Sequence, residues 1–99
     1  MDIIDCTSLD EVRAHIDSLD QRMVGLLTER GAYVQQAARF KRNTDEVQAP
    51  KRVAAIIERV RALAIAQGGN PEVTEATYRA MIAAFIEAES AEHARLHTR

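Results

Sequence analysis

The chain has 99 residues, a formal net charge of −2 at pH 7 and 46% hydrophobic residues, which suffices for one domain with a hydrophobic core. Its single cysteine, Cys6, excludes an internal disulfide framework and lacks metal-ligand spacing, which fits a reduced, cytoplasmic setting. No stretch approaches the about 18 apolar residues of a membrane span, the start carries no signal peptide, and basic residues are interspersed with acidic ones. We therefore expect no membrane and no nucleic acid as partner.

The first predicted element is a long amphipathic helix from Ser8 to Arg42. Ser8 followed three residues later by Glu11 is a capping box, which marks the helix start. Apolar side chains then recur at alternating steps of three and four residues, interrupted at Arg30. This apolar row comprises Leu9, Val12, Ile16, Leu19, Met23, Leu26, Tyr33, Ala37 and Phe40. Such a helix would run roughly 50 Å, whereas a compact domain of this length has a radius of gyration of only about 13 Å. The row therefore predicts half of an oligomer interface.

Two further helices are predicted after a polar loop at 43–48. Pro50 suits the first turn of a second helix, which Gly68–Gly69 ends, and Asn70–Pro71 opens a third helix that frays only near 97–99. The inward face of the third helix should comprise Val73, Thr77, Ala80, Met81, Ala84, Phe85 and Ala88. No strand alternation or hairpin signal occurs, so the predicted class is all-α, with three helices and a long first helix.

Three cations lie in the long helix at positions that bear on function. Arg30 interrupts the apolar row, and Lys41 returns to within about 20° of it and about 16 Å along the axis, with Val34 and Ala38 between. Two cations that flank a surface of small apolar side chains suit a compact ligand with separated negative charges. Both could instead extend to solvent or pair with acids of other helices. Arg13 lies about 25 Å from Arg30 along the helix, so as a site residue it must serve a neighbouring subunit.

Glu89 is an acid on the apolar face of the third helix. It follows Met81 and Phe85 at steps of four, which places it on the same face. The alternative is that the helix becomes exposed toward its polar end, so that Glu89 lies in solvent. The histidines should project into solvent rather than bind metal; they are His15, His93 and His97. Phosphate loops, nucleophile elbows and zinc motifs are absent from the sequence, so no cofactor and no metal is expected.

Three segments resemble the all-helical chorismate mutase family in order and spacing. They are Val12-Arg13-Ala14-His15-Ile16-Asp17-Ser18-Leu19-Asp20, Leu26-Leu27-Thr28-Glu29-Arg30 and Arg39-Phe40-Lys41. The resemblance covers nearly the whole chain and implies a single chorismate mutase-like domain, 1–99, that forms an intertwined homodimer with two sites. In each site, Arg30 and the partner's Arg13 would bind the two carboxylates of chorismate, a small-molecule dianion, and Lys41 would donate to its ether oxygen.

These cations suit the Claisen rearrangement of chorismate to prephenate in aromatic amino-acid biosynthesis. That reaction needs no nucleophile and no metal. It needs the enolpyruvyl arm held against the ring and a donor aimed at the ether oxygen as charge gathers there. Arginine binds carboxylates through a bidentate fork, and lysine supplies a compact point donor.

Several positions depart from the family's pattern. Val47, Pro50 and Lys51 stand where many bacterial mutases carry an acid, an arginine and a glutamate, and Phe85 replaces a serine. The expected lining of the site is Val34, Ala38, Val47 and Phe85. Glu89 replaces a glutamine, as in fungal relatives. An ionised Glu89 only accepts hydrogen bonds and repels the dianion, so a useful Glu89 must be protonated, and turnover should fall as the pH rises through neutrality.

Two alternatives to a mutase remain open. The segments Asp5-Cys6-Thr7 and Ala49-Pro50-Lys51-Arg52-Val53 resemble the isochorismate-pyruvate lyase branch, which uses the same pocket to eliminate pyruvate from isochorismate and leave salicylate. Against the lyase, that branch keeps a glutamine at the Glu89 position and a glutamate at the Lys51 position. The other alternative is a non-catalytic helical dimerisation or regulatory module that keeps the fold without turnover.

Overall fold

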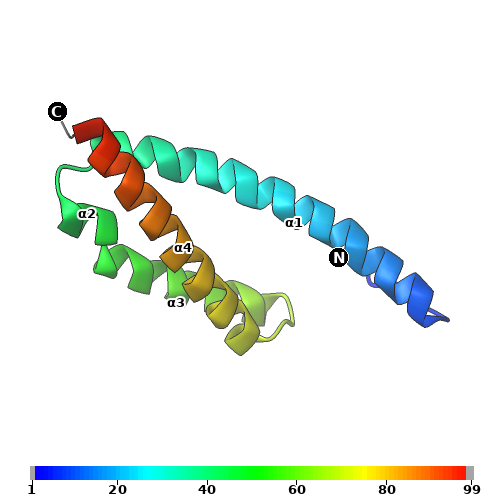
Figure 1. Ribbon diagram of the computed structural model, residues 1–99. Coiled ribbons are helices and arrows are strands. Elements are labelled where there is room, and N and C mark those ends of the chain that lie inside the picture. The colour runs from blue at the N-terminus through cyan, green and yellow to red at the C-terminus, as the bar shows by residue number, and fades with distance from the viewer. Residues whose placement is uncertain (1, 98–99) are drawn as a thin grey trace. The chain divides into compact units, whose positions relative to one another are not determined.

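The structure, a computed structural model, describes residues 2–97 and consists of helices joined by short connections (Figure 1). Its elements in chain order are α1 (Leu9–Ala37), the short 3-10 helix η1 (Ala38–Phe40), α2 (Thr44–Gln48), α3 (Pro50–Ala66) and α4 (Pro71–His97). The described range contains no strand. The predicted all-α class with three long helices and a long first helix is therefore confirmed. The chain forms two compact units, Met1–Ala32 and Tyr33–Arg99.

The start of α1 is set by side chains close in sequence. Ser8 Oγ accepts a hydrogen bond from the Glu11 backbone N–H at 3.1 Å, as a capping box requires. The Glu11 carboxylate, however, accepts from the Thr7 backbone N–H at 3.3 Å and from Thr7 Oγ1 at 3.2 Å rather than from Ser8. The predicted helix start is confirmed, and these bonds tie residues 6 and 7 to the first turn.

No residue of α1 is buried within this chain. The large apolar side chains of the apolar row in α1 are between 38% and 66% exposed. Their exposure agrees with the sequence argument that one subunit does not cover this face. None of the helices in the part described combines the length and the apolar run needed to cross a membrane.

The end of α1 differs from the prediction. The helix stops at Ala37, tightens into η1 and gives way to Lys41, whose backbone is extended at φ −94° and ψ 135°. The prediction of one helix to Arg42 was therefore wrong in its last turn. The physical reason is local competition for the backbone. The Arg42 N–H donates to the Glu46 carboxylate at 2.5 Å, and Asn43 Oδ1 accepts from the Glu46 N–H at 2.9 Å.

Residues 43–48, predicted as a loop, contain the short helix α2. Asn43 caps it, and Asp45 and Glu46 lie in its first turn, where negative charge is favourable. Val47 points into the protein and is 2% exposed. The helix ends at Gln48. Ala49 follows with a φ of 41°, in the left-handed region, and Pro50 begins α3 directly afterwards. The predicted start of the second long helix at Pro50 is confirmed.

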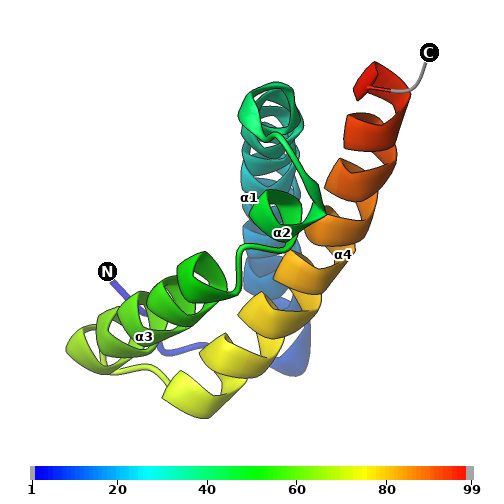
Figure 2. The same ribbon diagram turned by 90° about the vertical axis from the view of Figure 1, so that its left-hand side faces the viewer.

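Helices α3 and α4 form a hairpin around the hydrophobic core of the second unit (Figure 2). The buried members are Ile56, Ile57, Val60 and Ile82, against which Val53, Tyr78, Met81 and Ile86 pack. Gly68 makes the turn with φ 74°, and Asn70 Oδ1 accepts from the Glu72 N–H at 2.9 Å, which confirms the predicted helix end and start. The predicted inward face of α4 was partly wrong in register, because Val73 is 61% exposed whereas Ile82 is buried.

An ion-pair cluster joins α3 to the first turns of α4. Arg61 pairs with Glu72 at 3.0 Å and with Glu75 at 2.7 Å, and Arg79 pairs with Glu75 at 2.7 Å. Hydrogen bonds from Arg61 lower the pKa of Glu72, and hydrogen bonds from Arg79 and Arg61 lower the pKa of Glu75. A lowered carboxylate pKa stabilises the folded state above the pKa of the unfolded chain, and that contribution is lost as the pH falls through the folded pKa.

We expect Arg61→Met to lower the melting temperature by a few degrees at pH 7, and to have less and less effect as the pH falls below about 4.5 and through the lowered pKa values of Glu72 and Glu75. Thermal unfolding followed by circular dichroism across this pH range measures this difference. Arg59→Met, a change at an exposed arginine of the same helix, is the control. An equal loss for Arg61→Met at every pH would assign the effect to packing of the arginine stem rather than to its charge.

Candidate active site

The centre of the candidate site is an ion pair between Lys41 and Glu89. Lys41 Nζ lies 2.5 Å from Glu89 Oε2, and the two side chains are 26% and 4% exposed. Among the described residues, Glu89 is the charged residue whose side chain is buried. The sequence prediction that Glu89 lies on the apolar face of the last helix is confirmed. A buried carboxylate needs a compensating cation, and Lys41 provides it across 48 residues of sequence.

Helix α4 binds the backbone of Lys41 as well as its side chain. His93 Nε2 lies 2.7 Å from the Lys41 carbonyl oxygen, and because that oxygen only accepts, Nε2 carries the proton. His93 follows Glu89 by four residues, so one face of α4 contacts both ends of this lysine. The prediction that His93 is solvated was wrong. The signal was present in the sequence, because Met81, Phe85, Glu89 and His93 continue one row at steps of four.

The segment after Lys41 is fixed as well. Arg42 Nε donates to Glu46 Oε1 at 3.0 Å, in addition to its backbone bond to the same carboxylate. The Arg42 backbone N–H holds the pKa of the Glu46 carboxyl below its usual range. The extended backbone at Lys41 is thus anchored by His93 on one side and by Glu46 on the other.

Three of the predicted lining residues lie on elements that meet: α4, which carries Phe85, contacts both η1, which carries Ala38, and α2, which carries Val47. Val34 lies near the end of α1. Ala38 is fully buried and Val47 is 2% exposed, whereas Val34 and Phe85 are half-buried. All four belong to the same unit as Lys41 and Glu89. Their burial shows that they pack within this unit, and their role as substrate lining stays a prediction.

The two arginines lie in the other unit, on α1. Arg13 is exposed and Arg30 is half-buried. Both belong to one continuous helix, so the seventeen residues between them correspond to about 25 Å, and one subunit does not bring them together. The predicted angular relation between Arg30 and Lys41 was wrong, because Lys41 lies in extended backbone beyond the helix. Their joint action on one ligand stays a prediction.

The Lys41 and Glu89 arrangement presents a cation beside a buried acid and supplies no activated nucleophile. It is suited to binding negative charge and to stabilising charge that develops during a reaction. This pair does not form a metal site, because the lysine ammonium donates hydrogen bonds and has no lone pair to offer a metal ion. Within residues 2–97, a group of side chains that could hold a metal ion lies elsewhere, near the start of α1.

Comparisons with known proteins place the chain in a wider group. The family described as chorismate mutase type II matches residues 12–90, a range that includes Arg13, Arg30, Lys41 and Glu89. The isochorismate pyruvate lyase of Pseudomonas aeruginosa is 45% identical over 58 residues, which is 58% of this chain and 57% of that relative. The matched segment thus spans a little more than half of the relative's length. Since the family match extends over most of the sequence and of the observed helices, the chain belongs to the chorismate mutase type II family.

Proposed function

We propose that the protein is a chorismate mutase that converts chorismate to prephenate. The observation that supports this proposal most is the fixed position of Lys41. Two residues of α4 hold it, because Glu89 pairs with its side chain and His93 binds its backbone carbonyl. Membership of the chorismate mutase type II family supports it. In this proposal Lys41 donates to the ether oxygen while its bond breaks, and fixed donors stabilise such developing charge without reorganising.

We propose further that the working unit is a homodimer in which the sites are shared. The apolar row of α1 is exposed in the single chain, and a second copy would cover it with the same row, as a two-fold interface requires. The about 25 Å between Arg13 and Arg30 supports the same arrangement, since Arg13 can reach a ligand bound at Arg30 only from a neighbouring subunit. Arg30 and the partner's Arg13 would then bind the two carboxylates.

The second candidate activity is that of an isochorismate-pyruvate lyase. The 45% identical relative bears that name, and this supports the lyase as the second candidate. The elimination would use the same cations, because the substrate is also a dianion and charge again develops at the ether oxygen. Glu89 departs from the glutamine of the lyase pattern and resembles fungal mutases, which favours the mutase, whereas Lys51 departs from both patterns.

Separate incubations with chorismate and with isochorismate test these proposals. A mutase consumes chorismate and forms prephenate, a lyase consumes isochorismate and forms salicylate with pyruvate, and a non-catalytic module changes neither substrate. Arg59→Ala, at an exposed position of α3 outside the proposed site, is the control for the arginine variants discussed below. Unchanged concentrations of both substrates would overturn the proposed enzyme.

Glu89→Gln should improve substrate binding. The Glu89 carboxylate offsets the charge of Lys41 and repels the dianion, and glutamine removes that charge while keeping the shape. We expect the KM to fall roughly fivefold. Steady-state kinetics of the variant and the wild type measure the effect. An unchanged KM would show that the Glu89 charge does not oppose substrate binding.

His93→Ala should lower kcat about tenfold without unfolding the protein, because it releases the Lys41 carbonyl and lets the lysine shift relative to the substrate. His93→Gln keeps an N–H donor and should recover part of the loss. The kcat and KM of both variants, with circular dichroism as the fold control, separate positioning from stability. Equal kcat values for His93→Ala and wild type would show that the hydrogen bond does not position Lys41 for turnover.

A further inference from the structure

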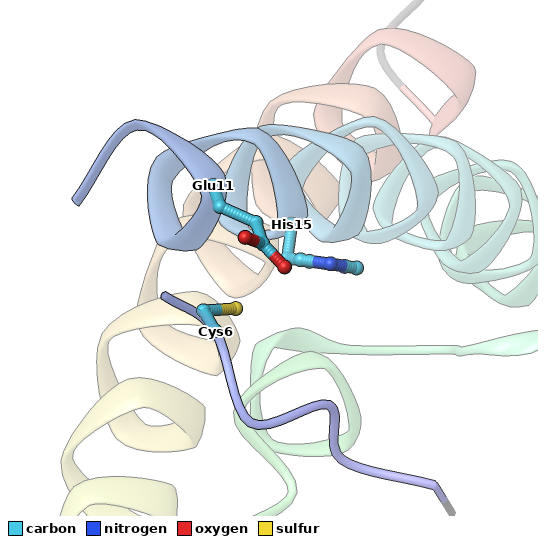
Figure 3. Close-up of side chains that lie close together, drawn as sticks. All are labelled: Cys6, Glu11 and His15. Carbon is cyan, nitrogen blue, oxygen red and sulfur yellow. The ribbon is translucent and has the colours of Figure 1, made fainter. Parts of the chain in front are cut away.

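A group of metal-ligating side chains lies at the start of α1. Cys6 Sγ, a Glu11 carboxylate oxygen and a His15 ring nitrogen all lie within 4.8 Å of one another (Figure 3). All three belong to the unit Met1–Ala32. Cys6 and Glu11 precede the family-matched range, which begins at residue 12, so the group as a whole is not part of the matched sequence.

Local structure explains why the three side chains converge. Glu11 and His15 are four residues apart in α1 and therefore leave the helix on the same face. Cys6 precedes the helix, and Figure 3 shows its sulfur directed toward the other two side chains. The bonds from Thr7 to the Glu11 carboxylate hold this carboxylate and fix the bend between Cys6 and the helix. Such outer contacts orient ligands in metal sites.

The donor chemistry matches zinc. Thiolate sulfur, imidazole nitrogen and carboxylate oxygen are its usual protein ligands, and three of them leave a fourth position for water. Ligand atoms around one tetrahedral zinc ion lie roughly 3.3–3.8 Å apart, so the group needs to close by about 1 Å. The exposed His15 ring and the half-buried Cys6 can rotate to do so. Two anionic donors also offset the unfavourable effect of a cation near the positive helix N-terminus.

We propose that Cys6, Glu11 and His15 form a binding site for one zinc ion per chain. Zinc replaces the proton of the Cys6 thiol, which otherwise lies 3.7 Å from the Ile4 carbonyl oxygen, and binding therefore releases a proton to solvent. The ion ties the segment before α1 to the second turn of the helix and stabilises the folded chain through its binding free energy. The site shares no residue with the proposed active site.

Cobalt(II), which binds in zinc sites and gives coloured complexes, is the probe, and it is added to the reduced protein. We expect a thiolate-to-cobalt absorption band that saturates at one ion per chain and disappears when zinc is added. Cys6→Ser should abolish the band, and His15→Gln and Glu11→Gln should each weaken zinc binding about tenfold or more, measured by competition with a chelator. Zinc titration in weak buffer should release a proton from wild type and not from Cys6→Ser.

Asp10→Asn is the matched control, since Asp10 is an acid of the same helical turn outside the group. It should bind zinc like the wild type, and zinc should raise the melting temperature of both but not that of Cys6→Ser. Cys6 lies outside the helix, so its substitution tests the ligand without disturbing the cap. Absence of the cobalt band, or equal zinc affinity in wild type and Cys6→Ser, would overturn the proposal and leave an adventitious ion only.

Discussion

Lys41→Met should lower kcat/KM by about 100- to 1,000-fold with whichever substrate the protein turns over, which is the usual cost of losing one preorganised donor. Methionine keeps the length and apolar stem of lysine but has neither the charge nor the N–H donors. Steady-state kinetics with chorismate and isochorismate measure the loss. Arg39→Met, which removes an exposed neighbouring cation in η1, should retain most of the activity.

The same substitution has a structural effect that must be separated from the catalytic one. Without Lys41, the Glu89 carboxylate is buried beside no cation, and we expect the free energy of unfolding to fall by about 1–3 kcal/mol. Adding Glu89→Gln removes the buried charge and should restore stability. The double variant should stay inactive, because the donor is still missing. Recovery of activity together with stability would show that Lys41 acts through folding alone.

Arg30→Ala should abolish turnover of either substrate, since it removes a bidentate partner for a carboxylate. The proposed homodimer should persist or become tighter, because the substitution takes a charge out of the apolar row of α1. Activity assays and analytical ultracentrifugation of the same sample measure both properties. Loss of the dimer together with activity would instead assign Arg30 a structural role.

Subunit mixing tests whether Arg13 is supplied by the partner. Arg13→Ala and Arg30→Ala should each be inactive alone, and unfolding and refolding them together should restore about a quarter of wild-type activity. Half of the randomly formed dimers are mixed, and each mixed dimer contains one site with both arginines intact. Mixed dimers without recovered activity would contradict shared sites, and a monomeric wild type would contradict the dimer itself.

Signals within a few residues were sufficient for the helix starts. Ser8 and Asn70 mark helix starts by accepting hydrogen bonds from backbone N–H groups two or three residues later, and Pro50 marks one through its fixed φ. The structure confirms all three starts. The apolar face of the last helix also placed Glu89 inside, because periodicity along one helix is visible in the sequence. The all-α class follows from these local signals.

The end of α1 depends on hydrogen bonds of the segment that follows it, and the spacing of apolar residues in the sequence does not reveal these bonds. The apolar row continues through Phe40, yet α1 ends at Ala37. Beyond η1, the Glu46 carboxylate accepts from the Arg42 N–H and Asn43 caps α2, and these bonds compete with continuation of the long helix. The polar composition of 43–48 likewise suggested a loop, whereas capping by Asn43 and burial of Val47 make it helical.

The sequence by itself determined the helical class, the capped starts of the long helices and the buried face that carries Glu89. Only the tertiary structure decided that Lys41 is the partner of Glu89 and that His93 binds the Lys41 backbone. Those contacts join residues 48 and 52 positions apart, and they form only where α4 packs against η1 and α2. Capping and periodicity act over one or two turns, whereas the pairing of a buried charge depends on which distant segment the fold brings beside it.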